Sequence, residues 1–518
     1  MKETGRAQKK WTLRAMDAVE RAGNALPDPA LLFVILTALT IAASYFTAKS
    51  GVSVSYEGVN SATGTIETIH AQAYNLLSLE GFHYMVTSVI KNFTGFFPLG
   101  TVFTIILGVS VCEGTGMLNA LLRKLVSKTP KALISAMIVF LGGMSNVASS
   151  TGYVVLVPLG AVTFIACNRH PIAGLAAAYA GVSGGWTANL LLGSNDPLYA
   201  GMSTQAANIL NPDYVVQPTG NWYFMVASTV LVVLIGTWVT DHIVEPHLPL
   251  YQPEEDARVQ DLTLDEKKGM RAAGFAALAY IVVMLSLVLP SGGLLRNPTT
   301  GQVLGSPFMS GIIFFMMLLF LIPGVAYGVA SGKIKSSRDL TNLMSTGIAG
   351  ISSFLVLLFF AAQFTFFFNK SNLGIIISVK GAHFLESVGL VGLPLLWVFI
   401  LVTAFINLLI PVDTAKWAMM APIFVPMFMH LGYAPELTQL VFRIGDSATN
   451  IITPLMPFFV MIVAYFQKYD KKAGIGSVLS TMLPYSIALL VGWILMLSLW
   501  FVLKLPIGPG APMFYGNI

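Results

Sequence analysis

Long apolar runs recur along the whole chain, and they constrain its fold more than any other feature. Hydrophobic residues occupy 55% of the 518 positions, and charged residues occupy only 10%. A run of about 18 or more apolar residues can cross the hydrocarbon core of a bilayer as one helix. Because lipid offers no partners for backbone N–H and C=O groups, such runs must be helical. The pattern predicts an all-α polytopic membrane protein.

The apolar runs are of two kinds. Single runs predict nine transmembrane helices, at 31–48, 86–113, 172–195, 221–241, 271–290, 309–330, 343–369, 438–466 and 477–503. Two further runs, 132–166 and 388–431, are too long for one helix and are interrupted midway by polar residues. These two runs predict re-entrant helical hairpins, each of which enters and leaves the membrane on one side.

Basic residues are distributed unevenly among the predicted loops. With the N-terminus inside, the external loops 49–81 and 197–220 contain a single Lys or Arg, Lys49, and the internal loops contain many. The positive-inside rule therefore predicts a cytoplasmic N-terminus. The first hairpin then opens to the cytoplasm. An odd number of spans separates the hairpins, so the second opens to the outside, and the two are inverted repeats.

The charge distribution also divides the chain. The densest charge lies in 242–270, which predicts a cytoplasmic linker between a first membrane half, 31–241, and a second, 271–518. Residues 1–30 are predicted to form a basic cytoplasmic N-terminal segment. No short apolar region with a small-residue cleavage site follows, so the first run is interpreted as a retained span and not as a signal peptide.

One unit of sequence occurs twice. Asn146 is followed 43 residues later by Asn189, and Asn407 is followed 43 residues later by Asn450. All four asparagines lie in or beside strongly apolar sequence, where an unbonded amide is costly. Interrupted apolar segments at matching places in two halves indicate the binding site of a secondary transporter.

A cation site is predicted at the tip of the first hairpin. Helix ends leave carbonyl groups without partners, and Asp196 follows a segment that glycine and proline interrupt. Carbonyls beside a carboxylate suit sodium, although Asp196 can also be an ordinary helix end at the external surface. The predicted ion-binding residues are Ser145, Asn146, Asn189, Gly193, Asp196 and Asn450, with sodium at Asn146 and Asp196. The coupling ion is sodium or a proton, and no other cofactor is expected.

Charged residues of the second repeat point to substrate binding. Arg443 and Asp446 are three residues apart on one predicted helix, so they can pair with each other. Alternatively, Arg443 grips a substrate carboxylate by a two-pronged contact, and Asp446 orients the substrate or carries a coupling charge. Trp417 offers a flat face to an aromatic ring, or else serves packing. Asp413 and Lys416, also three apart, are predicted to pair.

Other functional classes find little support. The basic residues lie in loops between apolar runs, so the net charge of +5 does not indicate a nucleic-acid partner. Two cysteines, Cys112 and Cys167, form neither a disulfide framework nor a CxxC motif. An intramembrane hydrolase, the alternative enzyme class, would need a nucleophile–base pair or a metal set within the membrane, and no HExxH metal motif occurs. A passive channel would not require an inverted pair of hairpins.

Several strings resemble the aminobenzoyl-glutamate transporter (AbgT) family, nearly end to end. They include Lys91-Asn92-Phe93-Thr94-Gly95-Phe96, Arg169-His170-Pro171-Ile172-Ala173-Gly174-Leu175, Ala421-Pro422-Ile423-Phe424-Val425-Pro426-Met427 and Arg443-Ile444-Gly445-Asp446-Ser447. The resemblance implies an ion-transporter-superfamily-like fold and a homodimer in the inner membrane. It also implies ion-gradient-driven transport of p-aminobenzoyl-glutamate or related folate catabolites, and in some members export of sulfonamide antimetabolites. The positions that match the family's substrate and ion region are Asp196, Asn407, Trp417, Pro435, Arg443, Asp446 and Pro454.

The hairpin tips depart from the family pattern. The second tip reads Pro411-Val412-Asp413-Thr414-Ala415-Lys416, where the family has small and hydroxylic residues of a Gly-Ser-x-Ser-Ala kind. The first tip has Ser150 where the resemblance implies an acidic residue. A charged, proline-stiffened second tip can alter the ion site or the substrate. The alternative function is therefore a cation-coupled carrier of another small carboxylate.

Overall fold

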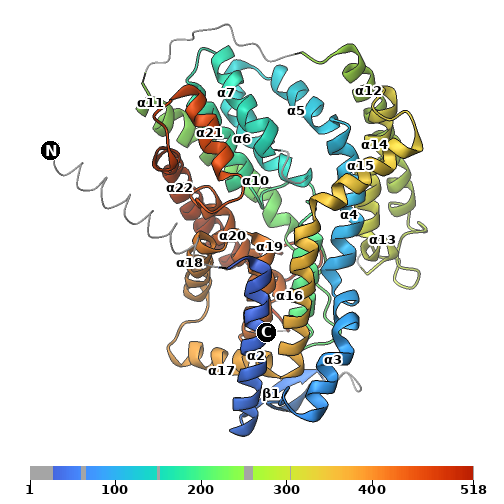
Figure 1. The fold of residues 1–518 in the computed structure, drawn as a ribbon, viewed down its shortest axis with the longest axis vertical. Coiled ribbons are helices and arrows are strands. Elements are labelled where there is room, and N and C mark those ends of the chain that lie inside the picture. Colours follow the sequence, from blue (N-terminus) through green and yellow to red (C-terminus); the bar gives the residue numbers. More distant parts are fainter. Residues whose placement is uncertain (1–26, 60–65, 149–151, 250–260, 304, 517–518) are drawn as a thin grey trace, which may run out of the picture.

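The computed structural model describes residues 27–59, 66–148, 152–249, 261–303 and 305–516. Nearly all regular structure in this part of the chain is helical, and several of the longest helices run along the long axis of the molecule (Figure 1). Seven helices are long and apolar enough to span a membrane: Pro29–Lys49 (α2), Leu79–Gly114 (α3 and α4), Trp222–His247 (α10 to α11), Leu264–Val288 (α12), Ile312–Ala330 (α14), Ser352–Lys370 (α16) and Ile475–Val502 (α22). The prediction of a polytopic helical membrane protein is confirmed.

Two of the nine predicted spans contain an irregular segment of several residues. The segment 172–195 contains α8 (Pro171–Tyr179) and the π-helical turn η4 (Ala180–Gly184), and then an irregular chain. The segment 438–466 contains α20 (Pro435–Asn450) and α21 (Phe459–Tyr469) with a break between them.

The breaks follow from helix-disrupting residues. Two glycines, Gly184 and Gly185, end the first helix, and Pro454 and Pro457 lack the N–H groups that a continuous second helix needs. A further pair, Met117–Ser127 and Lys131–Ser145, bends by 119° and raises the described count to eight if taken as one span. The total of nine stays a prediction, because interrupted helices can also cross a membrane.

The other elements are shorter. Within the spans above, α3 is Leu79–Thr94, α4 is Phe97–Gly114, α10 is Trp222–Val239, η5 is Thr240–Val244 and α11 is Glu245–His247. The remaining helices are α5 (Met117–Ser127), η1 (Lys131–Leu133), α6 (Ile134–Ser145), η2 (Asn146–Ala148), η3 (Gly152–Leu156), α7 (Val157–Ala166), α9 (Asp196–Ala207), α13 (Pro307–Ser310), α15 (Ser337–Gly350), α17 (Leu373–Ser387), α18 (Leu393–Leu409) and α19 (Asp413–His430).

A β-hairpin lies within the predicted external loop 49–81. Strands β1 (Ser53–Val59) and β2 (Ile66–Gln72) pair antiparallel, with Ser53 opposite Gln72. The alternation of serines with Val54 and Tyr56 is the period-two pattern of a strand with one covered face, and Tyr56 is buried.

The prediction that 197–220 is an external loop is wrong over its first part. Helix α9 begins at Asp196, and ten of its twelve residues are buried. It packs against α4, α19 and α20. The absence of Lys and Arg, which suggested an external loop, is equally what a buried helix requires, because an unpaired buried charge is costly.

Both predicted hairpins are pairs of short helices joined at a break. The first consists of α6 and the segment Gly152–Ala166, and the second of α18 and α19. The apolar segments Gly152–Ala166 and Leu393–Leu409 are shorter than the seven spans, which fits re-entrant arms. Ser150, named above for the first tip, lies outside the described residues. How deeply the two hairpins enter a membrane stays a prediction.

The first arm of each hairpin packs on the interrupted helix of its own repeat, α6 on η4 and α18 on α20. Both contacts depend on a glycine that allows the backbones to touch. A Cβ atom at Gly181 would lie 2.4 Å from the Val139 carbonyl oxygen, and one at Gly445 would lie 2.5 Å from the Ile400 carbonyl oxygen. The sequence repeat is therefore also a repeat in three dimensions.

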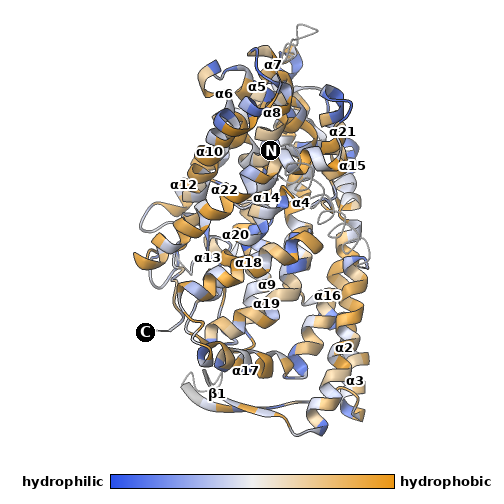
Figure 2. Ribbon diagram, turned by 90° about the vertical axis from the view of Figure 1, so that its left-hand side faces the viewer, coloured by the Kyte–Doolittle hydropathy of each residue, from blue (hydrophilic) through white to orange (hydrophobic). Residues whose placement is uncertain are grey.

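The outermost helices are apolar on almost every side. Only 17% of the α2 span window and 6% of the α12 window is buried, and hydrophobic colours run along these helices in Figure 2. Side chains such as Phe46, Phe275 and Leu278 point away from the molecule. Such surfaces are compatible with lipid, which is as apolar as leucine. The homodimer stays a prediction.

The close contact at Gly445 predicts that adding one methyl group there lowers the stability of the protein. In Gly445→Ala the new methyl would overlap the α18 backbone, which cannot move aside as a side chain can, at a cost of about 1–3 kcal/mol. We expect a lower thermal unfolding midpoint of the purified protein in detergent. Gly274→Ala is the control, because a Cβ atom there meets nothing within 4 Å. Equal midpoints for the two variants would show that α18 and α20 are not tightly packed.

Candidate functional site

The polar residues predicted from sequence meet where the two halves of the chain pack together. Helix α20 supplies Arg443, Asp446 and Asn450, and every one of its residues is buried. Asp196 comes from α9, and Asn407 comes from α18. Helices α19 and α20 lie side by side near the middle of the molecule (Figure 1). Residues far apart in sequence thus form one buried polar cluster.

Arg443 forms an ion pair across the two halves. Its Nη2 donates to Asp196 Oδ1 at 2.6 Å, and its guanidinium carbon lies 5.0 Å from the centre of the Tyr199 ring. The Nε and Nη1 groups of Arg443 are buried and have no hydrogen-bond partner in the described part of the chain. The sequence-based alternative of an Arg443–Asp446 pair is wrong, because each residue has a different partner.

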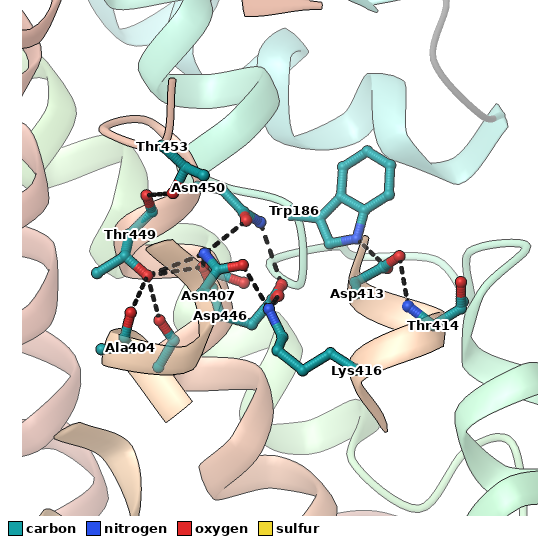
Figure 3. A network of polar contacts seen from close by, with 12 residues as sticks. Trp186, Ala404, Asn407, Asp413, Thr414, Lys416, Asp446, Thr449, Asn450 and Thr453 are labelled. Carbon is teal, nitrogen blue, oxygen red and sulfur yellow. Dashed lines mark hydrogen bonds and ion pairs between the residues drawn. The ribbon is translucent and has the colours of Figure 1, made fainter. Parts of the chain in front are cut away.

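Lys416 pairs with Asp446, not with Asp413 as the sequence predicted. Its Nζ lies 2.5 Å from Asp446 Oδ1 and also contacts Asn407 Oδ1, and both charged side chains are 0% exposed. Asn450 Nδ2 donates to the other carboxylate oxygen of Asp446 at 3.1 Å. Figure 3 shows the lysine, the carboxylate and the two amides pointing toward one another.

Asp413 is held by hydrogen bonds from three side chains that no sequence pattern connects to it. Its Oδ2 accepts hydrogen bonds from Trp186 Nε1 at 2.7 Å, from Asn195 Nδ2 at 3.1 Å and from the Tyr199 hydroxyl. Trp186 and Asp413 are drawn together in Figure 3. The second hairpin tip is thereby attached to the first half of the chain. No local pattern marks Trp186 or Tyr199 as partners, since they lie more than 200 positions away in sequence.

The two tip asparagines make equivalent contacts. Asn146 Nδ2 donates to the Gly185 carbonyl at 3.3 Å and Asn407 Nδ2 to the Asp446 carbonyl at 2.9 Å, each 39 residues later. Asn407 Nδ2 also lies 2.8 Å from Asn450 Oδ1, the second asparagine of its repeat. The asparagines of each repeat thus tie a hairpin tip to an interrupted helix.

Oxygen atoms gather around Gly193 at the first tip. A Cβ atom at Gly193 would lie 3.5 Å from the main-chain oxygen of Asn146, 3.6 Å from Asp196 Oδ2 and 3.8 Å from the Asn189 amide. When the Asn189 amide is turned so that its nitrogen donates to the Gly143 carbonyl at 2.6 Å, its oxygen faces this space.

Two further observations bear on the first tip. Asn146 Oδ1 is buried and has no partner in the described part of the chain, whereas the Ser145 hydroxyl donates to the Gly142 carbonyl at 2.6 Å. The alternative that Asp196 is an exposed helix end is wrong, because Asp196 is 1% exposed. Four of the six predicted ion-binding residues, Asn146, Asn189, Gly193 and Asp196, thus lie around the space beside Gly193.

Trp417 is enclosed by protein. Its ring is 0% exposed and packs on Phe442, with 4.6 Å between the ring centres. Its Nε1 donates to Ser203 Oγ at 3.1 Å, and Ser203 donates to Gln439 at 2.7 Å. Trp417 therefore lies beside the cluster, with its ring packed against protein and no open face toward a ligand, and its role in substrate binding stays a prediction.

The two predicted prolines define the ends of α20. Pro435 occupies the first turn of the helix, where its missing N–H costs nothing. Pro454 lies in the irregular segment that follows Asn450. Both shape the backbone around the cluster.

A cavity of about 760 Å³ lies apart from these residues. It is lined by the β-hairpin, by α17 and by the end of α19, and its wall includes Tyr56, His383 and His430. None of the predicted site residues lines it. The polar cluster, and not this cavity, holds the buried charges of Arg443, Lys416 and their carboxylate partners.

Comparisons with known proteins identify relatives over nearly the whole chain. The model of the AbgT putative transporter family matches residues 14–515. The chain is 40% identical over 492 residues to the p-aminobenzoyl-glutamate transport protein of Escherichia coli (strain K12), which covers 95% of each chain. It resembles the MtrF structure from Neisseria gonorrhoeae, described as one of a class of antimetabolite efflux pumps, with 47% identity, a TM-score of 0.90 and coverage of 96% and 100% of the two chains. The YdaH transporter of Alcanivorax borkumensis gives 40% identity, a TM-score of 0.87 and coverage of 93% and 100%.

Removing the charge of Asp413 should loosen the contact between the halves. In Asp413→Asn, three donors would face a neutral amide, and hydrogen bonds to a charged acceptor are the stronger kind. We expect a loss of stability of about 1–3 kcal/mol, seen as a lower thermal unfolding midpoint. Asp213→Asn, at an exposed position, is the matched control. If both variants unfold at the wild-type temperature, Asp413 does not hold the tip.

Proposed function

We propose that this chain, which belongs to the AbgT transporter family, is an ion-gradient-driven secondary transporter of p-aminobenzoyl-glutamate or related folate catabolites. The names of the relatives support this substrate class, and the antimetabolite pumps among them extend it to sulfonamides, which mimic the aminobenzoyl ring. Family membership also favours transport over the intramembrane hydrolase. The proposal includes a homodimer in the inner membrane with a cytoplasmic N-terminus.

One observation carries the proposal: Arg443 is buried, and its Nε and Nη1 groups have no hydrogen-bond partner in the described part of the chain. A guanidinium presents five N–H groups, and Asp196 takes only the Nη2 side. A buried donor without a partner costs free energy, so a carboxylate that binds Nε or Nη1 recovers that cost. This is the chemistry that a glutamyl group offers.

The geometry of the guanidinium links substrate binding to Asp196. Each of the two planar forks of Arg443 includes Nη2, which now contacts Asp196 at 2.6 Å. Because Nη2 carries two N–H groups, one in each fork, a substrate carboxylate can take the fork that Asp196 leaves open. In our scheme the substrate carboxylate and Asp196 then share Nη2, and the two negative groups repel each other across the Arg443 guanidinium.

A monovalent cation in the oxygen-lined space beside Gly193 would reduce this repulsion. Asp196 Oδ2 and the main-chain oxygen of Asn146 border that space, and a cation there would offset the negative charge of Asp196. Cation and substrate then favour each other's binding, which is a coupling free energy between two sites. We propose sodium as this ion, with a proton as the alternative. Rocking of the hairpins against the outer helices would expose the site to either side in turn.

A carrier of another small carboxylate is the second candidate. It is favoured by the enclosure of Trp417 against Phe442, which leaves no open aromatic face for an aminobenzoyl ring. Both candidates use Arg443 in the same way. Competition of unlabelled glutamate and p-aminobenzoate against labelled p-aminobenzoyl-glutamate separates them.

Transport should depend on the Arg443 guanidinium. For Arg443→Lys we expect uptake of labelled p-aminobenzoyl-glutamate into proteoliposomes to fall by on the order of 10- to 100-fold, since a charge-assisted hydrogen bond contributes about 1.5–3 kcal/mol. The ammonium keeps the charge, so Asp196 keeps a partner, but the planar fork is lost. Arg338→Lys, at an exposed position, is the control. Wild-type uptake by Arg443→Lys would refute the role.

Filling the space beside Gly193 should remove the dependence of uptake on sodium. A methyl group there meets its neighbours at 3.5 to 3.8 Å, which is ordinary contact, so Gly193→Ala should fold normally. We expect sodium to stimulate uptake by the wild type relative to choline and to have no effect on the variant. Gly350→Ala, where a Cβ atom meets nothing within 4 Å, is the control. Undiminished sodium stimulation in Gly193→Ala would contradict the site.

A further inference from the structure

The two hairpin tips share a framework but differ at one oxygen atom. Each tip asparagine donates its amide nitrogen to a carbonyl 39 residues later, so each amide oxygen is left for another partner. Asn146 Oδ1 is buried and has no partner in the described part of the chain. Asn407 Oδ1, its counterpart, accepts a hydrogen bond from the Lys416 ammonium group.

The surroundings of the two oxygens differ in a matching way. Four residues after the second asparagine of each repeat, the first has Gly193 and the second has Pro454. The glycine leaves a space bordered by oxygen atoms, whereas a proline ring occupies volume at its own position. At the position 39 residues after the tip asparagine, the first repeat has Gly185 and the second has Asp446. Only the second repeat thus supplies a carboxylate at this position.

The Lys416 ammonium lies among oxygen atoms of the kind that bind a monovalent cation. It contacts Asn407 Oδ1 and lies 2.5 Å from Asp446 Oδ1. It is also 5.6 Å from the centre of the Phe442 ring. An ammonium group has three N–H donors, and two of them are used in these contacts. A fully buried lysine is costly unless it is paired, and here the pair replaces what a bound ion would otherwise supply to Asp446 and Asn407.

We propose that the ammonium group of Lys416 is a built-in cation that permanently fills the second of two repeat-related cation sites. Only the first tip would then exchange an ion with solution. The inference rests on the proposed function, because it takes the first tip as the site of the coupling cation. Its consequence is specific: replacing Lys416 by a small residue opens a second cation site formed by Asn407 Oδ1 and Asp446.

A purely structural ion pair makes a different prediction. Removing one partner of a buried pair leaves an uncompensated charge and destabilises the fold, whatever salt is present. If the pair instead occupies a cation site, added sodium takes the place of the ammonium and restores stability to Lys416→Ala, because a ligand that binds only the native state stabilises it. Lys416→Ser is a second variant, since its hydroxyl can also serve as an oxygen ligand.

The experiment measures binding of radioactive sodium to purified wild type, Lys416→Ala, Lys416→Ser, Gly193→Ala and the double variant Gly193→Ala/Lys416→Ala. Thermal unfolding of each is followed in sodium chloride and in choline chloride. Lys380→Ala, at an exposed position on α17, is the control for loss of a lysine. We expect about one sodium per chain for the wild type, none for Gly193→Ala, about two for the Lys416 variants and about one for the double variant.

The outcomes separate the two proposals. No binding to the wild type, with a gain of one ion in the Lys416 variants, would overturn the first-tip site and support the built-in cation. One ion in the wild type and still one in both Lys416 variants would overturn the built-in cation alone. Lys416 variants that stay unfolded at every sodium concentration would also overturn it, because sodium is expected to substitute for the ammonium. Midpoints of Lys380→Ala should not depend on the choice of salt beyond the wild-type response.

Discussion

Helix α20 is buried along its whole length, although half of its sixteen residues are polar or charged. Burying such groups without partners would cost several kcal/mol each, so the rest of the structure is arranged to supply partners. Asp196 of α9 meets Arg443, Lys416 of α19 meets Asp446, and the Thr187 hydroxyl lies 2.8 Å from the Ser447 hydroxyl. These partners come from both halves of the chain, which must therefore fold together.

The two repeats share their backbone contacts but differ in the side chains at their hairpin tips. Each half ties a hairpin tip to an interrupted helix through an asparagine, and each packs the first arm of the hairpin closely on that helix through a glycine. On this common framework the side chains have diverged. The first repeat keeps small residues and the Asn146 amide oxygen, which has no hydrogen-bond partner among the described residues, and the second carries the charged pair of Lys416 and Asp446. Under the proposed function, this asymmetry would let one transporter bind a cation and an anionic group at neighbouring places.

The sequence predicted the parts of the structure that depend on local pattern. Apolar length was sufficient for spans such as α2 and α22, and the equal spacing of the asparagines was sufficient to locate both tips. The partners of the buried charges could not be predicted in this way. Residues three apart on a helix can pair, but a buried charge selects the best partner from any element that packs on it. Asp413 therefore bonds to Trp186 and Tyr199, which no spacing rule connects to it. Helix α9 could not be predicted from the sequence, because a stretch without charge fits an external loop as well as a buried helix.

In the proposed function, Asp196 is the residue that would couple ion binding to substrate binding. One of its oxygens faces Arg443, and the other accepts the Gly193 N–H at 2.6 Å beside the oxygen-lined space. Asp196, Asp413 and Asp446 together carry one negative charge more than Lys416 and Arg443 carry positive charge. A monovalent cation at the first tip would balance this excess, and an anionic substrate on Arg443 would restore it. Because isolated charges are costly in a buried site, the proposed cation and an anionic substrate would each favour the binding of the other.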